Sequence, residues 1–96
     1  MSRHDTQNWL ICYDIADPRR LVRVHRALKQ EGTPMQYSVF WVQASRLRMG
    51  AIMAKLATLI DERADDVRAY PVPKDAWSVS LGNSMLPSGV LVGGVL

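Results

Sequence analysis

Two neighbouring features of the sequence have the residue types that bind a metal ion and a phosphate. Asp14 interrupts the apolar run from Trp9 to Ile15 near its C-terminal end, and Asp17-Pro18 follows. A carboxylate at such a position must be paired, bound to a metal or exposed, because an isolated buried charge is costly. The next segment is basic and contains Arg19, Arg20, Arg23, Arg26 and Lys29. A lone acid beside several arginines suits a divalent cation and a phosphate.

Each of these residues also has a purely structural interpretation. Asp14 could be a solvated acid at a strand end, and function has to be argued from a site. Asp17 is interpreted as a helix N-cap rather than as a ligand, because Pro18 follows it. The arginines could form an ordinary solvated helix face. No Glu stands four residues before any of them, which favours an external anion. In a helix, the arginines that lie on one side would be Arg19, Arg23 and Arg26.

Aromatic residues near these features could contact nucleic acid or belong to the core. Tyr13, Tyr37 and Phe40 could stack on bases, but large aromatic side chains are more often core residues. Ser38 could bind a phosphate, although a bond to the backbone is its commoner role. The sequence has no zinc-ligand spacing, Walker loop or nucleophile elbow.

The composition predicts one small folded domain over residues 1–96. Of these residues 48% are hydrophobic, and the net charge is +3, which leans toward anionic partners. The one cysteine, Cys12, cannot form an intrachain disulfide and fits a reducing cytoplasm. We expect a cytoplasmic protein without a membrane span, because no apolar stretch is long enough for one and no signal-peptide pattern occurs.

In the first half of the chain, periodicity predicts the elements that position these residues. Residues 9–15 should form a strand buried on both faces. Four apolar-face positions predict a helix from Pro18 to about Glu31, ended by Gly32 as its C′ residue and by Pro34. Those positions are Leu21, Val24, His25 and Leu28. Residues 35–42 are rich in strand formers and could be one strand, or two that meet near Tyr37-Ser38.

In the second half, Ser45 could cap a helix over about 46–63. Its apolar stripe would be Met49, Ile52, Met53, Leu56, Leu59 and Ile60. A charged turn over 61–66 precedes a strand over 67–72, which Pro71 places at an edge or near its end. A turn at 73–75 and a further strand over 77–81 precede the tail 82–96.

This order predicts an α+β ferredoxin-like sandwich, with two helices on one face of an antiparallel sheet and a core over about 9–81. The extra C-terminal strand is a candidate for pairing with a second subunit.

Several of these pieces together resemble the CRISPR-associated Cas2 family. They are the Tyr13-Asp14-Ile15-Ala16-Asp17 corner, Arg23-Val24, the segment Gln36 to Phe40 after Gly32, and Asp65 to Val72. The resemblance covers about Trp9 to Leu81. Two positions depart from it: Trp41 stands where many members have an acid, and Pro34 where some have a basic residue.

The resemblance implies a homodimer of ferredoxin-like domains that acts in spacer acquisition beside the Cas1 integrase. The C-terminal strand would cross to the partner's sheet, and Asp14 from both subunits would hold a divalent metal, usually Mg²⁺. Members are described as metal-dependent nucleases on single-stranded RNA or duplex DNA.

We therefore expect a magnesium-dependent endonuclease with Asp14 as its catalytic metal ligand. The residues expected to bind nucleic acid are Tyr13, Arg19, Arg20, Arg23, Ser38 and Phe40. The first alternative is a non-catalytic adaptor that holds duplex DNA for the integrase. The second is a small regulatory domain that binds a metabolite.

Overall fold

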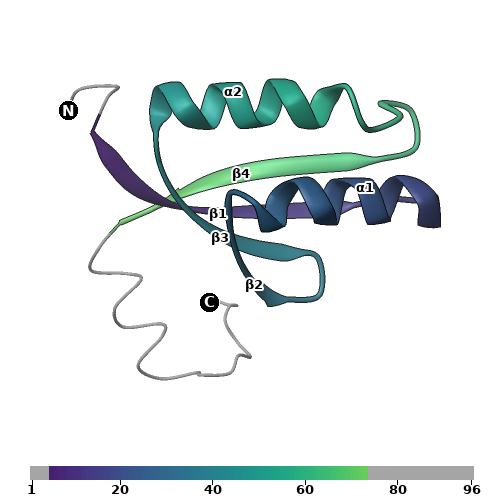
Figure 1. Ribbon diagram of the computed structural model, residues 1–96, viewed down its shortest axis with the longest axis horizontal. Helices are drawn as coiled ribbons and strands as arrows, with labels where there is room; N and C mark the ends of the chain where they lie inside the picture. The colour runs from purple at the N-terminus through teal and green to yellow at the C-terminus, as the bar shows by residue number, and fades with distance from the viewer. Residues whose placement is uncertain (1–4, 74–96) are drawn as a thin grey trace.

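An antiparallel sheet carries two helices on one of its faces (Figure 1). This computed structural model describes residues 5–73. The elements are β1 (Thr6–Asp14), α1 (Pro18–Lys29), β2 (Gly32–Gln36), β3 (Val39–Ser45), α2 (Arg46–Ala57) and β4 (Asp66–Val72). The strands lie in the order β2-β3-β1-β4, and all pairs are antiparallel. This is the predicted ferredoxin-like α+β sandwich.

Strand β1 is central and has two different faces. Trp9, Ile11 and Tyr13 alternate along it and are buried beneath the helices. Leu10 and Cys12 point to the opposite face and are only half-buried. The prediction of a strand buried on both faces is therefore wrong within residues 5–73. The strand also begins at Thr6, earlier than predicted, because Thr6 to Asn8 pair with β3.

Both helices begin at the predicted caps. The side chain of Asp17 accepts a hydrogen bond from the Arg20 backbone N–H at 3.0 Å, and Ser45 Oγ accepts from the Arg48 N–H at 3.0 Å. These bonds satisfy donors that have no partner within the first turn. Both helices end earlier than predicted, α1 at Lys29 and α2 at Ala57.

Gly32 has a different role from the predicted one. The helix cap is Gln30, and Gly32 begins β2 with a negative φ. A Cβ atom on Gly32 would lie 2.1 Å from the backbone oxygen of Trp41 on β3. Glycine is required here because two strands approach closely, rather than because a helix ends in a left-handed turn.

The segment 35–42 contains the end of one strand and the start of the next. Strand β2 ends at Gln36 and β3 begins at Val39, with the turn at Tyr37-Ser38. Ser38 has a φ of 63°, in the left-handed region that few residues other than glycine adopt. Its carbonyl accepts a hydrogen bond from the Tyr13 N–H at 3.0 Å, which fixes the turn against the end of β1.

The second half follows the predicted pattern where the structure describes it. Helix α2 buries Met49, Ile52 and Leu56, and Met53 is partly buried against the core. Leu59 and Ile60, which were predicted in the same helix, follow its end and are also partly buried against the core. Strand β4 is an edge strand among the described residues, in agreement with Pro71. The predicted turn after Pro73, the strand 77–81, the tail 82–96 and the subunit-crossing strand lie outside these residues. Within residues 5–73, neither helix is long and apolar enough to cross a membrane.

The two described glycines offer a matched test of packing. Gly32→Ala should destabilise the fold by about 1–3 kcal/mol, because the new methyl group meets backbone of β3. Gly50→Ala, on the exposed side of α2 with open space around it, should instead stabilise the fold by about 1 kcal/mol. Urea unfolding measures both changes, and a Gly32→Ala variant as stable as the wild type would contradict the close approach.

Candidate metal site and nucleic-acid surface

Asp14 lies at the C-terminal end of β1 with an exposed side chain. Successive side chains of a strand point to opposite faces of the sheet. Because Tyr13 points toward the helices, Asp14 points to the opposite, helix-free face. Directly across the ladder, Asp14 pairs in register with Asp66, the first residue of β4. The Asp66 carboxylate accepts a hydrogen bond from Nε of Arg68 at 2.9 Å, in an ion pair that is exposed to solvent.

The Asp14–Asp66 pair suits a hard divalent cation. Directly opposed residues of an antiparallel pair have Cβ atoms about 4.5–5.5 Å apart, which brings carboxylate oxygens within reach of one ion. Mg²⁺ commonly takes one or two carboxylates and completes its shell with water and phosphate oxygens. No group of three or more His, Cys, Asp or Glu residues that could hold a metal occurs in residues 5–73. Two carboxylates alone would leave most coordination positions of such a cation to water and other ligands.

A buried carboxylate next to this pair holds the surrounding loops together. The Asp65 side chain is fully buried and accepts hydrogen bonds from the backbone N–H groups of Ala16, at 2.9 Å, and Asp61, at 2.8 Å. It also accepts from Arg20, through Nε at 2.8 Å and Nη2 at 3.2 Å. These bonds join the segment after β1, the first turn of α1 and the loop before β4. They fix the two chain segments that carry Asp14 and Asp66.

The contact with Arg20 also sets the ionisation of Asp65. The hydrogen bonds from its guanidinium hold the pKa of the Asp65 carboxyl well below its usual value, and the two backbone N–H donors act in the same direction. The same contact raises the pKa of Arg20. Arg20 was expected to bind nucleic acid. The structure places its guanidinium on Asp65, where it positions loops, and its contact with phosphate stays a prediction.

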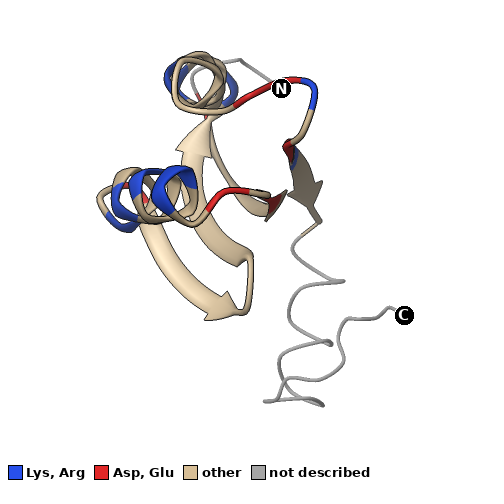
Figure 2. Cartoon of the chain, turned by 90° about the vertical axis from the view of Figure 1, so that its right-hand side faces the viewer, with Lys and Arg blue, Asp and Glu red and all other residues tan. Residues whose placement is uncertain are grey.

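The remaining arginines of α1 form a cationic stripe on the outer side of the helix. Arg19, Arg23 and Arg26 are all exposed and make no ion pair with a carboxylate in the described part of the chain. Figure 2 shows Lys and Arg along the helices, whereas Asp and Glu gather in the connecting loops. The stripe and Asp14 lie on opposite sides of the sheet, so the sequence neighbours do not form one continuous site.

The aromatic residues expected at the nucleic-acid surface are largely internal. Phe40 is fully buried, in contact with Tyr13 at a ring-centroid distance of 6.2 Å and with His25 at 5.3 Å. Tyr13 is 7% exposed, and burial raises the pKa of its hydroxyl. Ser38 is half-buried in the β2–β3 turn. Phe40 thus serves the core in this structure, while Tyr13 and Ser38 reach the groove between α1 and the hairpin.

Two residues of the candidate site were not predicted from the sequence. Asp65 and Asp66 were both assigned to a charged turn, although one is buried and the other opposes Asp14 in the sheet. The sequence feature that could have indicated this pairing is their position directly before an alternating strand. When the ends of two antiparallel strands are aligned, the first residue of one strand lies opposite the last residue of the other.

Comparison with known proteins gives one consistent family. The model of the family "CRISPR associated protein Cas2" matches residues 7–79. A CRISPR-associated endoribonuclease Cas2 of Nitrosomonas europaea is 38% identical over 90 residues, which cover 94% of this chain and 86% of the relative. A CRISPR-associated endoribonuclease Cas2 of Thermodesulfovibrio yellowstonii is 41% identical over 85 residues, which cover 88% of this chain and 93% of the relative.

Solved structures give the same result. The hypothetical protein TT1823 of Thermus thermophilus superposes with a TM-score of 0.70 at 29% identity, over 72% of this chain and 84% of that protein. Cas2 of Streptococcus pyogenes superposes with a TM-score of 0.66 at 27% identity, over 75% and 92% of the two chains.

The contacts of Asp65 predict how the stability of the fold should depend on pH. Because the pKa of Asp65 is lower in the folded chain than its ordinary value of 3.8, its contribution is complete at neutral pH. That contribution should decline as the pH falls through 3.8 toward the folded-state value. Asp65→Asn should lower stability at pH 7 and flatten the decline between about pH 5 and pH 2, measured by urea unfolding at each pH.

Asp17→Asn provides the matched control, since asparagine is an equally good N-cap. It should leave both the stability at pH 7 and its acid dependence close to those of the wild type. An Asp65→Asn variant with the full wild-type acid dependence would contradict the assigned role.

Proposed function

The chain belongs to the CRISPR-associated Cas2 family, and we propose that it is a magnesium-dependent endoribonuclease of that family with Asp14 and Asp66 as metal ligands. The observation that carries the proposal is the register that places these two exposed carboxylates opposite each other at the end of β1. The names of its relatives in Nitrosomonas europaea and Thermodesulfovibrio yellowstonii favour RNA as the substrate.

Each residue has a distinct part in the proposed reaction. Asp14 and Asp66 hold the cation, and Arg68 keeps Asp66 in place through its ion pair at 2.9 Å. A magnesium ion bound there would stabilise charge on the scissile phosphate and lower the pKa of a water. Asp65 and Arg20 act as positioning residues, because they fix both chain segments that carry the ligands.

The helix-free face of the sheet is the proposed homodimer interface. Leu10 pairs in register with Trp41 on one side and Tyr70 on the other, so apolar side chains cross this face in a row. Tyr70 is 46% exposed. A second copy that covers this face would bring another Asp14 to the same side of the sheet, as the family resemblance implies. A single monomeric species in sedimentation velocity would argue against this interface.

A second candidate function rests on the separate arginine stripe of α1. Arg19, Arg23 and Arg26 could hold duplex nucleic acid without involving Asp14, because they lie on the other side of the sheet. This arrangement fits an adaptor that presents DNA to the Cas1 integrase in spacer acquisition, within the cytoplasm. The two functions use different residues and can therefore be separated by mutation.

Asp14→Asn should abolish metal binding and cleavage together. Mn²⁺ titration followed by electron paramagnetic resonance should detect the wild-type site and lose it in the variant. Cleavage of single-stranded RNA should fall by about 100-fold or more, because the cation supplies several kcal/mol of transition-state stabilisation. A chelator should have the same effect on the wild type. Glu62→Gln, an equal charge change at an exposed neighbouring residue, should alter neither.

If the variant lacks the Mn²⁺ site but keeps wild-type cleavage, the proposed catalytic role is wrong. If it keeps both, the site itself is wrongly placed.

The arginine stripe should control binding without affecting the metal site. Replacing Arg19, Arg23 and Arg26 with glutamine should weaken duplex binding and reduce the slope of log affinity against log salt by about 0.9 for each phosphate that is no longer neutralised. Fluorescence anisotropy over a salt series measures this slope. The Mn²⁺ site should be retained, whereas Asp14→Asn should keep the wild-type slope.

Arg63→Gln, at an exposed arginine outside the stripe, is the matched control and should leave the slope unchanged. A triple variant with the wild-type slope would exclude α1 as the duplex-binding surface.

A further inference from the structure

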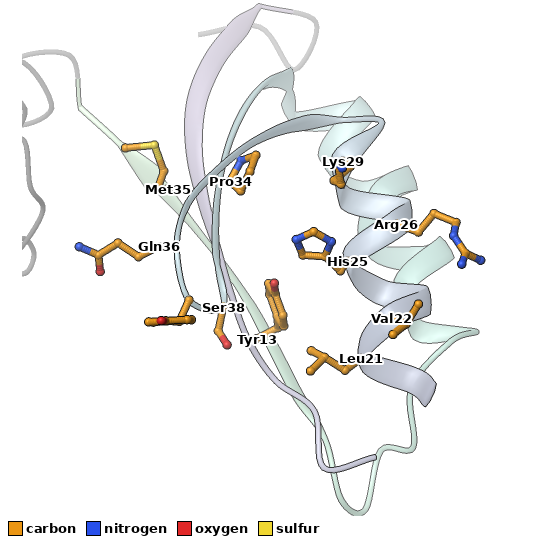
Figure 3. Close-up of a pocket in the computed structure, with 11 residues that line it drawn as sticks. Tyr13, Leu21, Val22, His25, Arg26, Lys29, Pro34, Met35, Gln36 and Ser38 are labelled. Atoms are coloured by element: carbon orange, nitrogen blue, oxygen red, sulfur yellow. The ribbon is translucent and has the colours of Figure 1, made fainter. Parts of the chain in front are cut away.

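A groove of about 1050 Å³ separates α1 from the β2–β3 hairpin, on the helix side of the sheet and away from the Asp14 carboxylate. Figure 3 shows Leu21 and His25 pointing from α1 into this groove, where they face Tyr13 of β1. Its volume slightly exceeds the usual range of small-molecule pockets, and it is open, because Leu21, Val22 and Met35 of its lining are exposed to solvent. The groove is separate from the proposed metal site and from the proposed homodimer interface on the helix-free face of the sheet.

The interior combines apolar walls with a few fixed polar groups. His25 packs edge-on against Phe40 at 5.3 Å, which holds its imidazole in the groove. The neighbouring Tyr13 hydroxyl is protonated at neutral pH, and burial raises its pKa further above the ordinary value. An imidazole and a phenol can donate and accept hydrogen bonds within an apolar slot. Such a site matches the polar edge and flat face of a nucleobase.

The rim of the groove is cationic. Arg26 and Lys29 line it, both are exposed, and the described residues that form the groove include no Asp or Glu. Arg26 also belongs to the arginine stripe, which begins at Arg19 about 10 Å away along the helix. A sugar–phosphate chain that follows the stripe therefore reaches the mouth of the groove.

The mouth carries an unusually exposed aromatic side chain. Tyr37 is 98% exposed at the hairpin turn, and the next residue, Ser38, holds the sparsely populated φ of 63°. Backbone strain of this kind persists where the surrounding structure enforces it, and it often marks binding sites. An exposed tyrosine at the hairpin end of the groove is a suitable stacking platform for an unpaired base.

We propose that this groove binds an unpaired nucleotide at the end of a nucleic acid held by the arginine stripe of α1. The base enters between α1 and the hairpin, toward His25 and Tyr13, and stacks at the mouth on Tyr37. Lys29 and Arg26 contact its phosphates. The inference rests on the nucleic-acid binding proposed above. A nucleotide fits better than an acidic peptide because the phosphate-binding stripe is continuous with the rim.

The test compares a blunt duplex with the same duplex bearing a short single-stranded tail, in DNA and RNA versions. Fluorescence anisotropy should show tighter binding of the tailed duplex by the wild type. Tyr37→Ala should reduce this gain in affinity by about 10-fold, because the variant loses the stacking of one base on the tyrosine ring. Lys29→Gln should reduce the gain, and both variants should bind the blunt duplex as the wild type does. A duplex whose tail consists of abasic sites should bind to the wild type and to Tyr37→Ala with equal affinity.

Leu47→Ala is the control, since it removes a half-exposed apolar side chain of α2 that does not line the groove, and it should keep the full gain. Equal affinity for blunt and tailed duplexes would overturn the groove proposal and leave duplex binding intact. No binding of either duplex would overturn the proposed nucleic-acid function and this inference together. A synthetic peptide of alternating glutamate and leucine that binds wild type but not Tyr37→Ala, with no gain from the tail, would assign the groove to a protein partner instead.

Discussion

The hydrogen bonds to the buried carboxylate of Asp65 determine the geometry at the end of the sheet that carries Asp14 and Asp66. Its oxygens accept bonds from the segment after β1, the start of α1 and the loop before β4. A buried anion without such donors would be strongly unfavourable, so the four bonds are needed together. Because Asp66 is the next residue, this network also fixes where β4 begins and thereby which residue opposes Asp14. The proposed metal ligands are exposed, but their spacing is set by a group that solvent does not reach.

Strand alternation divides the functional residues between two surfaces. Tyr13 and Asp14 are neighbours in the chain, yet one lies beneath the helices and the other faces the open side of the sheet. The arginine stripe lies along α1, and the two opposed carboxylates lie on the open face of the sheet. The proposed metal site, the arginine stripe and the groove therefore occupy different positions in this small domain.

Local signals in the sequence predicted the parts of the fold that depend on neighbouring residues. The caps at Asp17 and Ser45 and the stripe of α2 were predicted correctly because each depends on residues within about one or two turns. Gly32 was misassigned because its constraint comes from Trp41 across the sheet. The roles of Arg20 and Asp65 were missed for the same reason, since these partners are 45 residues apart. For the proposed site, the sequence predicted Asp14 near the end of its strand, as the structure has it, but its opposition to Asp66 depends on the register of β4, which no local pattern contains.

The opposition of Asp14 and Asp66 also has a thermodynamic consequence. Like charges directly across an antiparallel pair repel each other and weaken the sheet locally. A divalent cation between them would cancel this repulsion, and a ligand that binds only the folded chain stabilises it in proportion to the logarithm of its concentration. The end of the sheet would then be firmest when magnesium is abundant and would loosen first when it is scarce, so the ionic state of the cell would regulate the rigidity of this edge as well as any reaction that takes place there.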